Sequence, residues 1–279
     1  MERLQIPVGE WTFDALASGP PDGELVLLLH GFPQTSAEWR AQLTALAEAG
    51  YRAVAPDQRG YSPGARPLGV ESYHVRHLVD DVLAIADRLG GPSFHLVGHD
   101  WGAVVAWQVA GRFPERLRSL TAVSVPHPLA FATALVSESD DQRSRSAYVS
   151  FFRQPGSEDT MSPDVLRAVF HHSGHPGDVE QYVGAFAADP EAVTAALNWY
   201  RAIDLGMVMG LGPITTPTLY VWSTDDVALG REGAEATAAH VSGPYRFEVL
   251  EGVSHWGPEE AAGELNRLLV EHLASASVQ

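Results

Sequence analysis

Short apolar runs alternate with amphipathic stretches along most of the chain. The apolar runs cover residues 24–30, 52–57, 93–98, 117–125, 217–224 and 245–250, and their length and composition predict strands. Helical spacing of apolar positions predicts helices at 36–49, 73–89, 101–113, 231–240 and from Pro258 onward. This alternation is typical of a mostly parallel sheet that is covered by helices on both faces. The residues up to Leu16 are expected to add two antiparallel edge strands.

The regular alternation stops in the middle of the chain. From about His127 to Leu211 the predicted helices are irregular, rich in aromatic residues and interrupted by Gly, Pro and His. The simplest interpretation is a helical cap inserted between two strands, so we expect a core of residues 1–128 and 213–279 and a cap of residues 129–212. Such a cap would cover the carboxyl ends of the strands, where open α/β sheets bind their ligands.

Composition narrows the range of partners and chemistries. The 279 residues are 45% hydrophobic, which suits one large α/β domain, and they carry a net charge of −17. A surface this acidic repels phosphate backbones and anionic lipids. We therefore expect neither nucleic acid nor a membrane as a partner. The sequence contains no Cys and no Lys, which excludes disulfides, thiolate metal sites and Schiff-base chemistry. The segment from Met1 to Trp11 lacks the features of a signal peptide, and no apolar stretch reaches membrane-spanning length, which predicts a cytoplasmic protein.

The most specific motif is Gly98-His99-Asp100-Trp101-Gly102, between a predicted strand and a predicted helix. It has the small-x-nucleophile-x-small form of the nucleophile elbow, with Asp at the position that Ser holds in esterases. Glycines are needed on both sides because the central residue occupies a strained turn that neighbouring backbone crowds. An Asp that merely capped the next helix would not need these flanking glycines. The motif therefore predicts an α/β-hydrolase fold with a mostly parallel eight-stranded sheet, and Asp100 as the nucleophile.

An aspartate nucleophile indicates a particular kind of chemistry. A carboxylate is already ionised at neutral pH and can displace a leaving group at a saturated carbon, which forms an ester between enzyme and substrate. Hydrolysis of that ester requires an activated water and an oxyanion hole. The segment His30-Gly31-Phe32-Pro33 closes an apolar strand at the place where this fold supplies one oxyanion donor. We expect the backbone N–H groups of Phe32 and Trp101 to point at the carbonyl oxygen of Asp100.

The base that activates the water, and its acid partner, are expected later in the chain. The chain order of this fold is nucleophile, acid, base, and His255 follows the last predicted strand. Asp225 and Asp226 follow the strand at 217–224, and we assign Asp226 as the acid, with Asp225 as the alternative. The strand at 117–125 offers no competing acid, because residues 124–128 contain no carboxylate or amide side chain.

These motifs together resemble those of the epoxide hydrolases, in the aspartate-nucleophile branch of the α/β-hydrolase superfamily. The resemblance covers essentially the whole chain and includes four further segments: Asp57-Gln58-Arg59-Gly60, Phe113-Pro114-Glu115-Arg116, Phe151-Phe152-Arg153-Gln154-Pro155-Gly156 and Leu197-Asn198-Trp199-Tyr200-Arg201. The last two are similar to the signatures of the family's cap.

The resemblance implies that Tyr148 and Tyr200 bind the epoxide oxygen, and that Trp101 and Phe32 adjoin the substrate. Opening an epoxide leaves an alkoxide, which needs hydrogen-bond donors and finally a proton as it forms. A phenol, with a reference pKa of about 10, stays protonated at neutral pH and can donate.

The nearest alternative is a haloalkane or haloacid dehalogenase, which shares the Asp-His-Asp chemistry but must stabilise a departing halide. Fluoroacetate-type relatives carry Arg directly after the nucleophile, where this chain has Trp101, and haloalkane-type relatives carry Asn at the position of Phe32. A non-catalytic binding protein on the same fold is a third class, and such proteins typically lose part of the catalytic set. The five expected side chains are all present, which favours an epoxide hydrolase.

The resemblance implies a small-molecule epoxide as the partner and no cofactor, and it leaves a homodimer open. His171, His172 and His175 suggest a metal site, but their spacing includes no carboxylate ligand in a regular helix. We therefore expect no metal, and a solvated loop at these positions.

Overall fold

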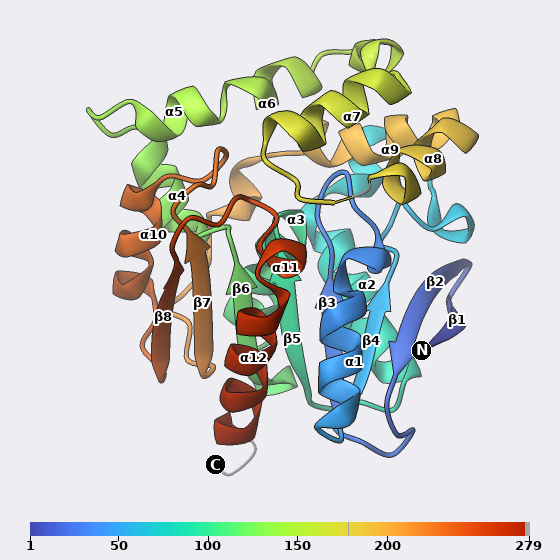
Figure 1. Cartoon of the computed structure of the whole chain (residues 1–279), viewed down its shortest axis with the longest axis vertical. Helices are drawn as coiled ribbons and strands as arrows, with labels where there is room; N and C mark the ends of the chain where they lie inside the picture. The colour runs from blue at the N-terminus through green and yellow to red at the C-terminus, as the bar shows by residue number, and fades with distance from the viewer. Residues whose placement is uncertain (178, 277–279) are drawn as a thin grey trace.

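The computed structural model describes residues 1–177 and 179–276 and has a twisted sheet at its centre (Figure 1). Its strands are β1 (Glu2–Val8), β2 (Trp11–Ser18), β3 (Leu25–Leu29), β4 (Arg52–Pro56), β5 (Phe94–His99), β6 (Leu117–Val123), β7 (Thr218–Ser223) and β8 (Tyr245–Leu250). The eight strands lie in the order β1-β2-β4-β3-β5-β6-β7-β8. Only β2 pairs antiparallel, with β1 and β4, and the other pairs are parallel. The predicted sheet is confirmed, including its two antiparallel edge strands.

Helices cover both faces of the sheet. On one face lie α1 (Arg40–Glu48) and α12 (Ala262–Ala276), and on the other lie α2 (Val75–Arg88) and α3 (Trp101–Arg112) (Figure 1). Side chains along β3 alternate between the two layers: Val26 and Leu28 belong to the core under α1 and α12, and Leu27 and Leu29 to the core under α2 and α3. Burial on both faces explains the uninterrupted apolar run of this strand.

Three predicted helices divide into shorter elements, and a turn of 3₁₀ helix precedes a fourth. Residues 36–49 form a 3₁₀ helix, η1 (Ser36–Trp39), followed by α1, and η3 (Val70–Tyr73) precedes α2. The predicted helix at 231–240 consists of α10 (Arg231–Ala236) and η7 (Thr237–His240), and the last predicted helix begins with the short α11 (Gly257–Glu260). The spacing of apolar residues does not distinguish one turn of 3₁₀ helix from one turn of α-helix, so the sequence predicted one continuous helix in each case.

A run of helices separates β6 from β7. It comprises α4 (Pro128–Leu135), α5 (Asp141–Arg145), α6 (Ala147–Phe152), α7 (Pro163–His172), α8 (Glu180–Ala188) and α9 (Pro190–Arg201), and we call residues 128–201 the insert. The insert lies across the carboxyl ends of the parallel strands (Figure 1). The helical segment expected between two strands is thus present, and its division from the core as a separate domain stays a prediction.

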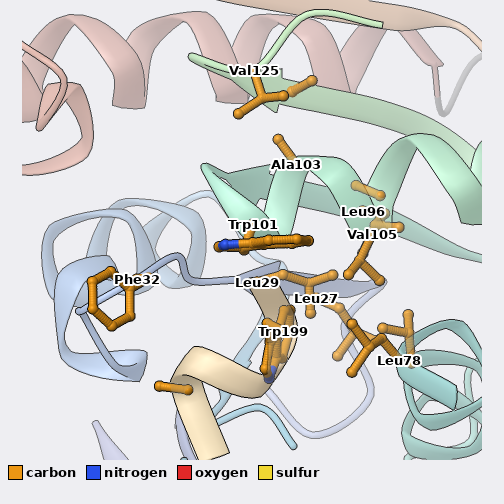
Figure 2. Close-up of a cluster of buried hydrophobic side chains, with 14 of the residues drawn as sticks. Leu27, Leu29, Phe32, Leu78, Leu96, Trp101, Ala103, Val105, Val125 and Trp199 are labelled. Atoms are coloured by element: carbon orange, nitrogen blue, oxygen red, sulfur yellow. The ribbon is translucent and has the colours of Figure 1, made fainter. Parts of the chain in front are cut away.

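The insert is anchored to the core through α9. Figure 2 shows Trp199 directed from α9 towards Trp101 at the start of α3, and their ring centroids are 5.6 Å apart. The indole N–H of Trp199 also donates to the backbone oxygen of Arg59 over 2.9 Å. This contact holds α9 directly above the turn between β5 and α3.

No helix within residues 1–177 and 179–276 combines the length and the apolar character needed to cross a lipid bilayer.

Candidate active site

Asp100 occupies a tight turn between β5 and α3. Its φ of 51° lies in the left-handed region, which is costly for any residue with a side chain. The glycines around it leave no space for a Cβ atom. A Cβ at Gly98 would collide with the backbone oxygen of Gly102, and one at Gly102 would collide with that of Leu29. A Cβ at Gly31 would overlap the Cβ of Asp100 itself, so β3, β5 and α3 converge on this side chain.

The Asp100 carboxylate is held by two groups. The N–H of Phe32 donates to its Oδ1 over 2.9 Å, and Nε2 of His255 lies 3.6 Å from its Oδ2. Burial raises the pKa of Asp100, but the hydrogen bonds and charges of His255 and the N–H of Phe32 outweigh burial and hold the pKa below its ordinary value. The carboxylate is therefore ionised at neutral pH, as a nucleophile must be.

His255 is paired with Asp226 on its other side. Its Nδ1 lies 3.0 Å from Oδ2 of Asp226, while Oδ1 of Asp226 accepts from the N–H groups of Ala228 and Leu229 at 2.8 and 3.0 Å. Burial lowers the pKa of His255, but the two carboxylates of Asp226 and Asp100 outweigh it and raise the pKa to about 10. The imidazole is therefore protonated in the resting site and lies between two carboxylates.

The alternative acid lies outside this arrangement. Asp225 is exposed, and its carboxylate accepts only from the hydroxyl of Thr224, over 3.3 Å, among the hydrogen bonds of the described chain. Asp226 is 1% exposed. The geometry thus favours Asp226 over Asp225 as the partner of His255.

Ser124, at the end of β6, joins this pair. Its hydroxyl donates to Oδ2 of Asp226 over 2.7 Å and lies 3.1 Å from Nδ1 of His255. Residues 124–128 contain no acidic side chain, and nothing in the sequence alone indicated this role of Ser124. A serine after a buried strand carries no distinctive signal, because its partners lie 102 and 131 residues further along the chain.

A second buried pair lies behind His255. Nε2 of His99 lies 2.9 Å from the backbone oxygen of His255 and must carry the hydrogen, because a carbonyl only accepts. Nδ1 of His99 faces Oε2 of Glu38 at 3.5 Å, and neither side chain is exposed to solvent. Burial lowers the pKa of His99 to about 4, and burial together with the charges of Glu259 and Asp100 raises that of Glu38 well above its ordinary value. His99 is therefore neutral at neutral pH and supports the backbone of His255, while burial favours the neutral form of Glu38 beside it.

A cavity of about 700 Å³ extends from Asp100 between the sheet and the insert. Asp100, Trp101, Tyr148 and Tyr200 line it, together with an otherwise mainly apolar wall that includes Val104, Val125, Phe131, Leu135, Ile203, Met207 and Leu229. The rings of Tyr148, in α6, and Tyr200, in α9, have centroids 6.3 Å apart. The structure therefore brings both predicted tyrosines into one cavity with the predicted nucleophile.

The two phenols remain protonated. Burial, followed by the nearby Tyr148 and the charge of Asp100, raises the pKa of Tyr200 well above its ordinary value. Burial and the charges of Asp100 and Asp226 raise the pKa of Tyr148 as well, although 40% of that residue is exposed. Each can therefore donate a hydrogen bond into the cavity at neutral pH.

Phe32 and Trp101 have different places in the site. Trp101 lines the cavity, and its N–H belongs to the first turn of α3, whose amides lack partners within the helix. The ring of Phe32 is not among the side chains that line the cavity and packs edge-on behind them, against Phe152 and Tyr200, with centroids 5.4 and 5.5 Å away. The backbone of Phe32 thus reaches Asp100 while its side chain supports the insert.

The expectation of a solvated loop at His171, His172 and His175 is wrong in part, because the first two belong to a helix and the third is buried. His171 and His172 are exposed at the end of α7, but His175 is buried, and its Nε2 lies 2.8 Å from Oε2 of Glu259. The carboxylate partner comes from a distant part of the chain, which a search within the loop could not find. No group of three or more His, Asp or Glu side chains within residues 1–177 and 179–276 is arranged to hold a metal ion.

Comparisons with known proteins agree with this geometry. A model of the alpha/beta hydrolase fold family matches residues 24–262. The AB hydrolase superfamily protein YfhM of Bacillus subtilis is 35% identical over 272 residues, with 94% of each chain covered. Epoxide hydrolase A of Mycobacterium tuberculosis is 31% identical over 307 residues, again with 94% of each chain covered. A crystal structure of an epoxide hydrolase of Bacillus megaterium with an inhibitor superimposes with a TM-score of 0.87 at 27% identity, covering 97% of this chain and 100% of that one.

The chain therefore belongs to the α/β-hydrolase fold family. Within that family it is a member of the epoxide hydrolases, as the sequence motifs implied.

Proposed function

We propose that this enzyme hydrolyses an epoxide to a vicinal diol through an ester formed at Asp100. The observation that carries the proposal is the convergence of an ionised buried carboxylate, its His255–Asp226 pair and two protonated phenols on one cavity. Relatives that are named epoxide hydrolases support the reaction class.

The first step is attack of Asp100 on an epoxide carbon. Oδ1 is engaged by the N–H of Phe32, so Oδ2 is the attacking atom. The C–O bond of the ring breaks, and its electron pair moves to the ring oxygen, which takes a proton from Tyr148 or Tyr200. Hydrogen bonds from two phenols to this oxygen strengthen as its charge develops, so they favour the transition state over the ground state.

The ester changes the protonation of His255. The carboxylate of Asp100 is one of the groups that raise the pKa of His255, and esterification removes its charge. The imidazolium can then release its proton, which restores the phenol through solvent. The site thus produces its own general base only after the first step has taken place.

The second step is hydrolysis of the ester. His255 takes a proton from a water, whose oxygen attacks the carbonyl carbon of Asp100. The N–H groups of Phe32 and Trp101 stabilise the charge on the carbonyl oxygen. The ester bond breaks, and the leaving oxygen takes the second proton of the attacking water, which leaves Asp100 as a carboxylate. The diol departs with one of the original oxygens of Asp100, and His255 keeps the first proton of the water, so the site returns to its resting protonation.

A dehalogenase would need different groups in the cavity. A departing halide requires hydrogen-bond donors but no proton. An alkoxide requires hydrogen bonds and a proton, and Tyr148 and Tyr200 can supply it with both. The apolar wall beyond them suits a hydrophobic substituent on the epoxide.

The experiment that tests this mechanism uses styrene oxide and a variant that lacks the base. His255→Gln should still form the ester, because an ionised carboxylate needs no base, but should not hydrolyse it. We expect intact-mass spectrometry to show one added substrate mass, located on the peptide that contains Asp100. In the native enzyme, a single turnover in heavy-oxygen water should label Asp100 and release largely unlabelled diol.

Direct attack of water on the epoxide makes the opposite prediction. The diol would carry the label in the first turnover, and the His255→Gln variant would show no adduct. That result would falsify the covalent mechanism even if the enzyme produced diol.

A further inference from the structure

The carboxylate of Glu259 joins three segments that are far apart in the chain. Glu259 lies in α11, four residues after His255. It accepts hydrogen bonds from Nε2 of Gln34 at 2.5 Å, Nε2 of His175 at 2.8 Å and the hydroxyl of Tyr182 at 3.0 Å. Gln34 follows β3, whereas His175 and Tyr182 belong to the insert.

All three partners act as donors. Nδ1 of His175 accepts from the N–H of Gly177 over 3.1 Å, so its hydrogen is on Nε2 and points at Glu259. Burial and the charge of Glu259 raise the pKa of Tyr182, which keeps its phenol protonated. Hydrogen bonds from such donors to a carboxylate are stronger than those between neutral groups.

The same part of the insert also holds both neighbours of His255. The hydroxyl of Ser254 lies 3.4 Å from the backbone oxygen of Gly174, and the indole N–H of Trp256 donates to the hydroxyl of Ser173 over 3.1 Å. The ring of Trp256 packs against Phe170 of α7 with centroids 4.9 Å apart. The loop that carries His255 is therefore fixed on both sides by the segment after α7.

Gln34 connects Glu259 to the other half of the site. Its N–H donates to the backbone oxygen of Gly31 over 3.0 Å, which closes the turn that contains Phe32. The N–H of Phe32 is the group that reaches Oδ1 of Asp100. One carboxylate thus joins the turn that carries the oxyanion donor to the loop that carries the base.

We propose that Glu259 is a positioning residue for the hydrolysis of the Asp100 ester. It holds the N–H of Phe32 and the imidazole of His255 in their relative places, and it makes that placement depend on a docked insert. This inference rests on the proposed two-step mechanism, because only in that mechanism do the N–H of Phe32 and the imidazole of His255 act together, in the hydrolysis of the ester.

The two steps should respond differently to loss of Glu259. Alkylation depends on the carboxylate of Asp100 and on the phenols of Tyr148 and Tyr200, and none of these contacts Glu259. Hydrolysis needs a water aligned between His255 and the ester carbon while Phe32 holds the oxygen. A shift of either group also disturbs the Asp100 carboxylate, which both groups hold, but it misaligns the base and the oxyanion donor of the hydrolysis step directly. Hydrolysis should therefore slow more than alkylation.

The test compares Glu259→Gln with Glu264→Gln in single turnovers of styrene oxide, followed by rapid quenching and intact-mass spectrometry. Glu259→Gln removes the charge that strengthens all three hydrogen bonds, and with its oxygen facing Gln34 and His175 its NH2 group meets the hydroxyl of Tyr182, which must then accept. The junction is therefore weakened without loss of volume. We expect hydrolysis of the adduct to slow by about tenfold, which is less than the effect of a 1 Å misplacement of a reacting group. Alkylation should slow much less. Glu264, which pairs with Arg267 on the surface of α12, is the matched control and should behave as the native enzyme.

Tyr182→Phe keeps the test valid if Glu259→Gln fails to fold, because it removes one donor and keeps the ring. Like Glu259→Gln, it should increase the fraction of alkyl-enzyme at steady state. Two results would overturn the proposal and show that the junction is merely structural. One is equal slowing of both steps in the two variants, and the other is a lower unfolding midpoint with both rate constants unchanged. Absence of any adduct in the native enzyme and in His255→Gln would instead refute the two-step mechanism itself, and the positioning role with it.

Discussion

Tyr148 and Tyr200 have unequal surroundings, although the proposed mechanism gives both the same task. Tyr200 is 4% exposed, and Phe32, Trp101 and Phe152 pack around its ring. Tyr148 is 40% exposed and contacts fewer rings. A phenol that neighbouring rings hold in place loses little entropy when it binds the epoxide oxygen, so Tyr200 should be the stronger donor of the two.

Replacement by phenylalanine tests this difference. Tyr200→Phe and Tyr148→Phe should each slow alkylation, within the range of about 10²–10⁴-fold that a positioned proton donor contributes, and Tyr200→Phe should slow it more. The double variant should have almost no activity while its unfolding midpoint stays near the native one. The measurement is the single-turnover rate of adduct formation from styrene oxide. A fully active double variant would contradict the assignment of both phenols.

At this scale the sequence predicted the residues that belong to local motifs. Glycine spacing marks Asp100 and the Phe32 turn, and a strand end marks Asp226, so the sequence could indicate these positions; their catalytic roles stay predictions. Ser124, Glu38 and Glu259 were not found, because each acts through partners that only the folded chain brings near. His175 was placed in solvent for the same reason, since its partner Glu259 lies 84 residues away.

At the scale of elements, the site depends on how closely α3 approaches β3. Gly102 lets the first turn of α3 lie against the end of β3, and the backbone oxygen of Leu29 fills the space where a Cβ would be. Strand and helix types were predictable, because burial on two faces and helical spacing leave clear patterns. The 3₁₀ turns were not predictable, because the same spacing fits both kinds of helix.

Gly102→Ala should therefore damage both packing and activity. We expect a loss of about 1–3 kcal/mol in the free energy of unfolding, as for other overpacked sites, because backbone rather than a flexible side chain must move. Turnover should fall as well, since the shift reaches Asp100. Gly184→Ala is the control: Gly184 lies within α8, no atom lies within 4 Å of its added Cβ, and alanine there should stabilise by up to about 1 kcal/mol. Urea unfolding measures both, and equal stability of the two variants would contradict the steric argument.

At the scale of the whole molecule, the site contributes to the pH dependence of stability. His255 is buried between Asp100 and Asp226, with His99 beneath it, and its pKa is raised to about 10. In the unfolded chain a histidine has a pKa of about 6.5. The pKa values of Asp100 and Asp226 are held below the ordinary value, so their contributions are lost only as the pH falls into the acid range. Between neutral pH and pH 10, His255 is therefore the member of this group that changes the stability.

The direction of that change follows from the two pKa values. Below about pH 6.5 the imidazole is protonated in both states, and its stabilising contribution is present in full. From there to about pH 10 the unfolded chain loses the proton and the folded chain keeps it, so the free energy of unfolding declines as the pH rises. Urea unfolding of the native enzyme at neutral pH and just below pH 10 should show this decline. His255→Gln lacks this titrating proton, so its free energy of unfolding should decline less over the same range. Glu264→Gln should follow the native enzyme. Parallel declines in the native enzyme and His255→Gln would mean that the pKa of His255 is not raised, and the resting site would then contain a neutral base before any ester is formed.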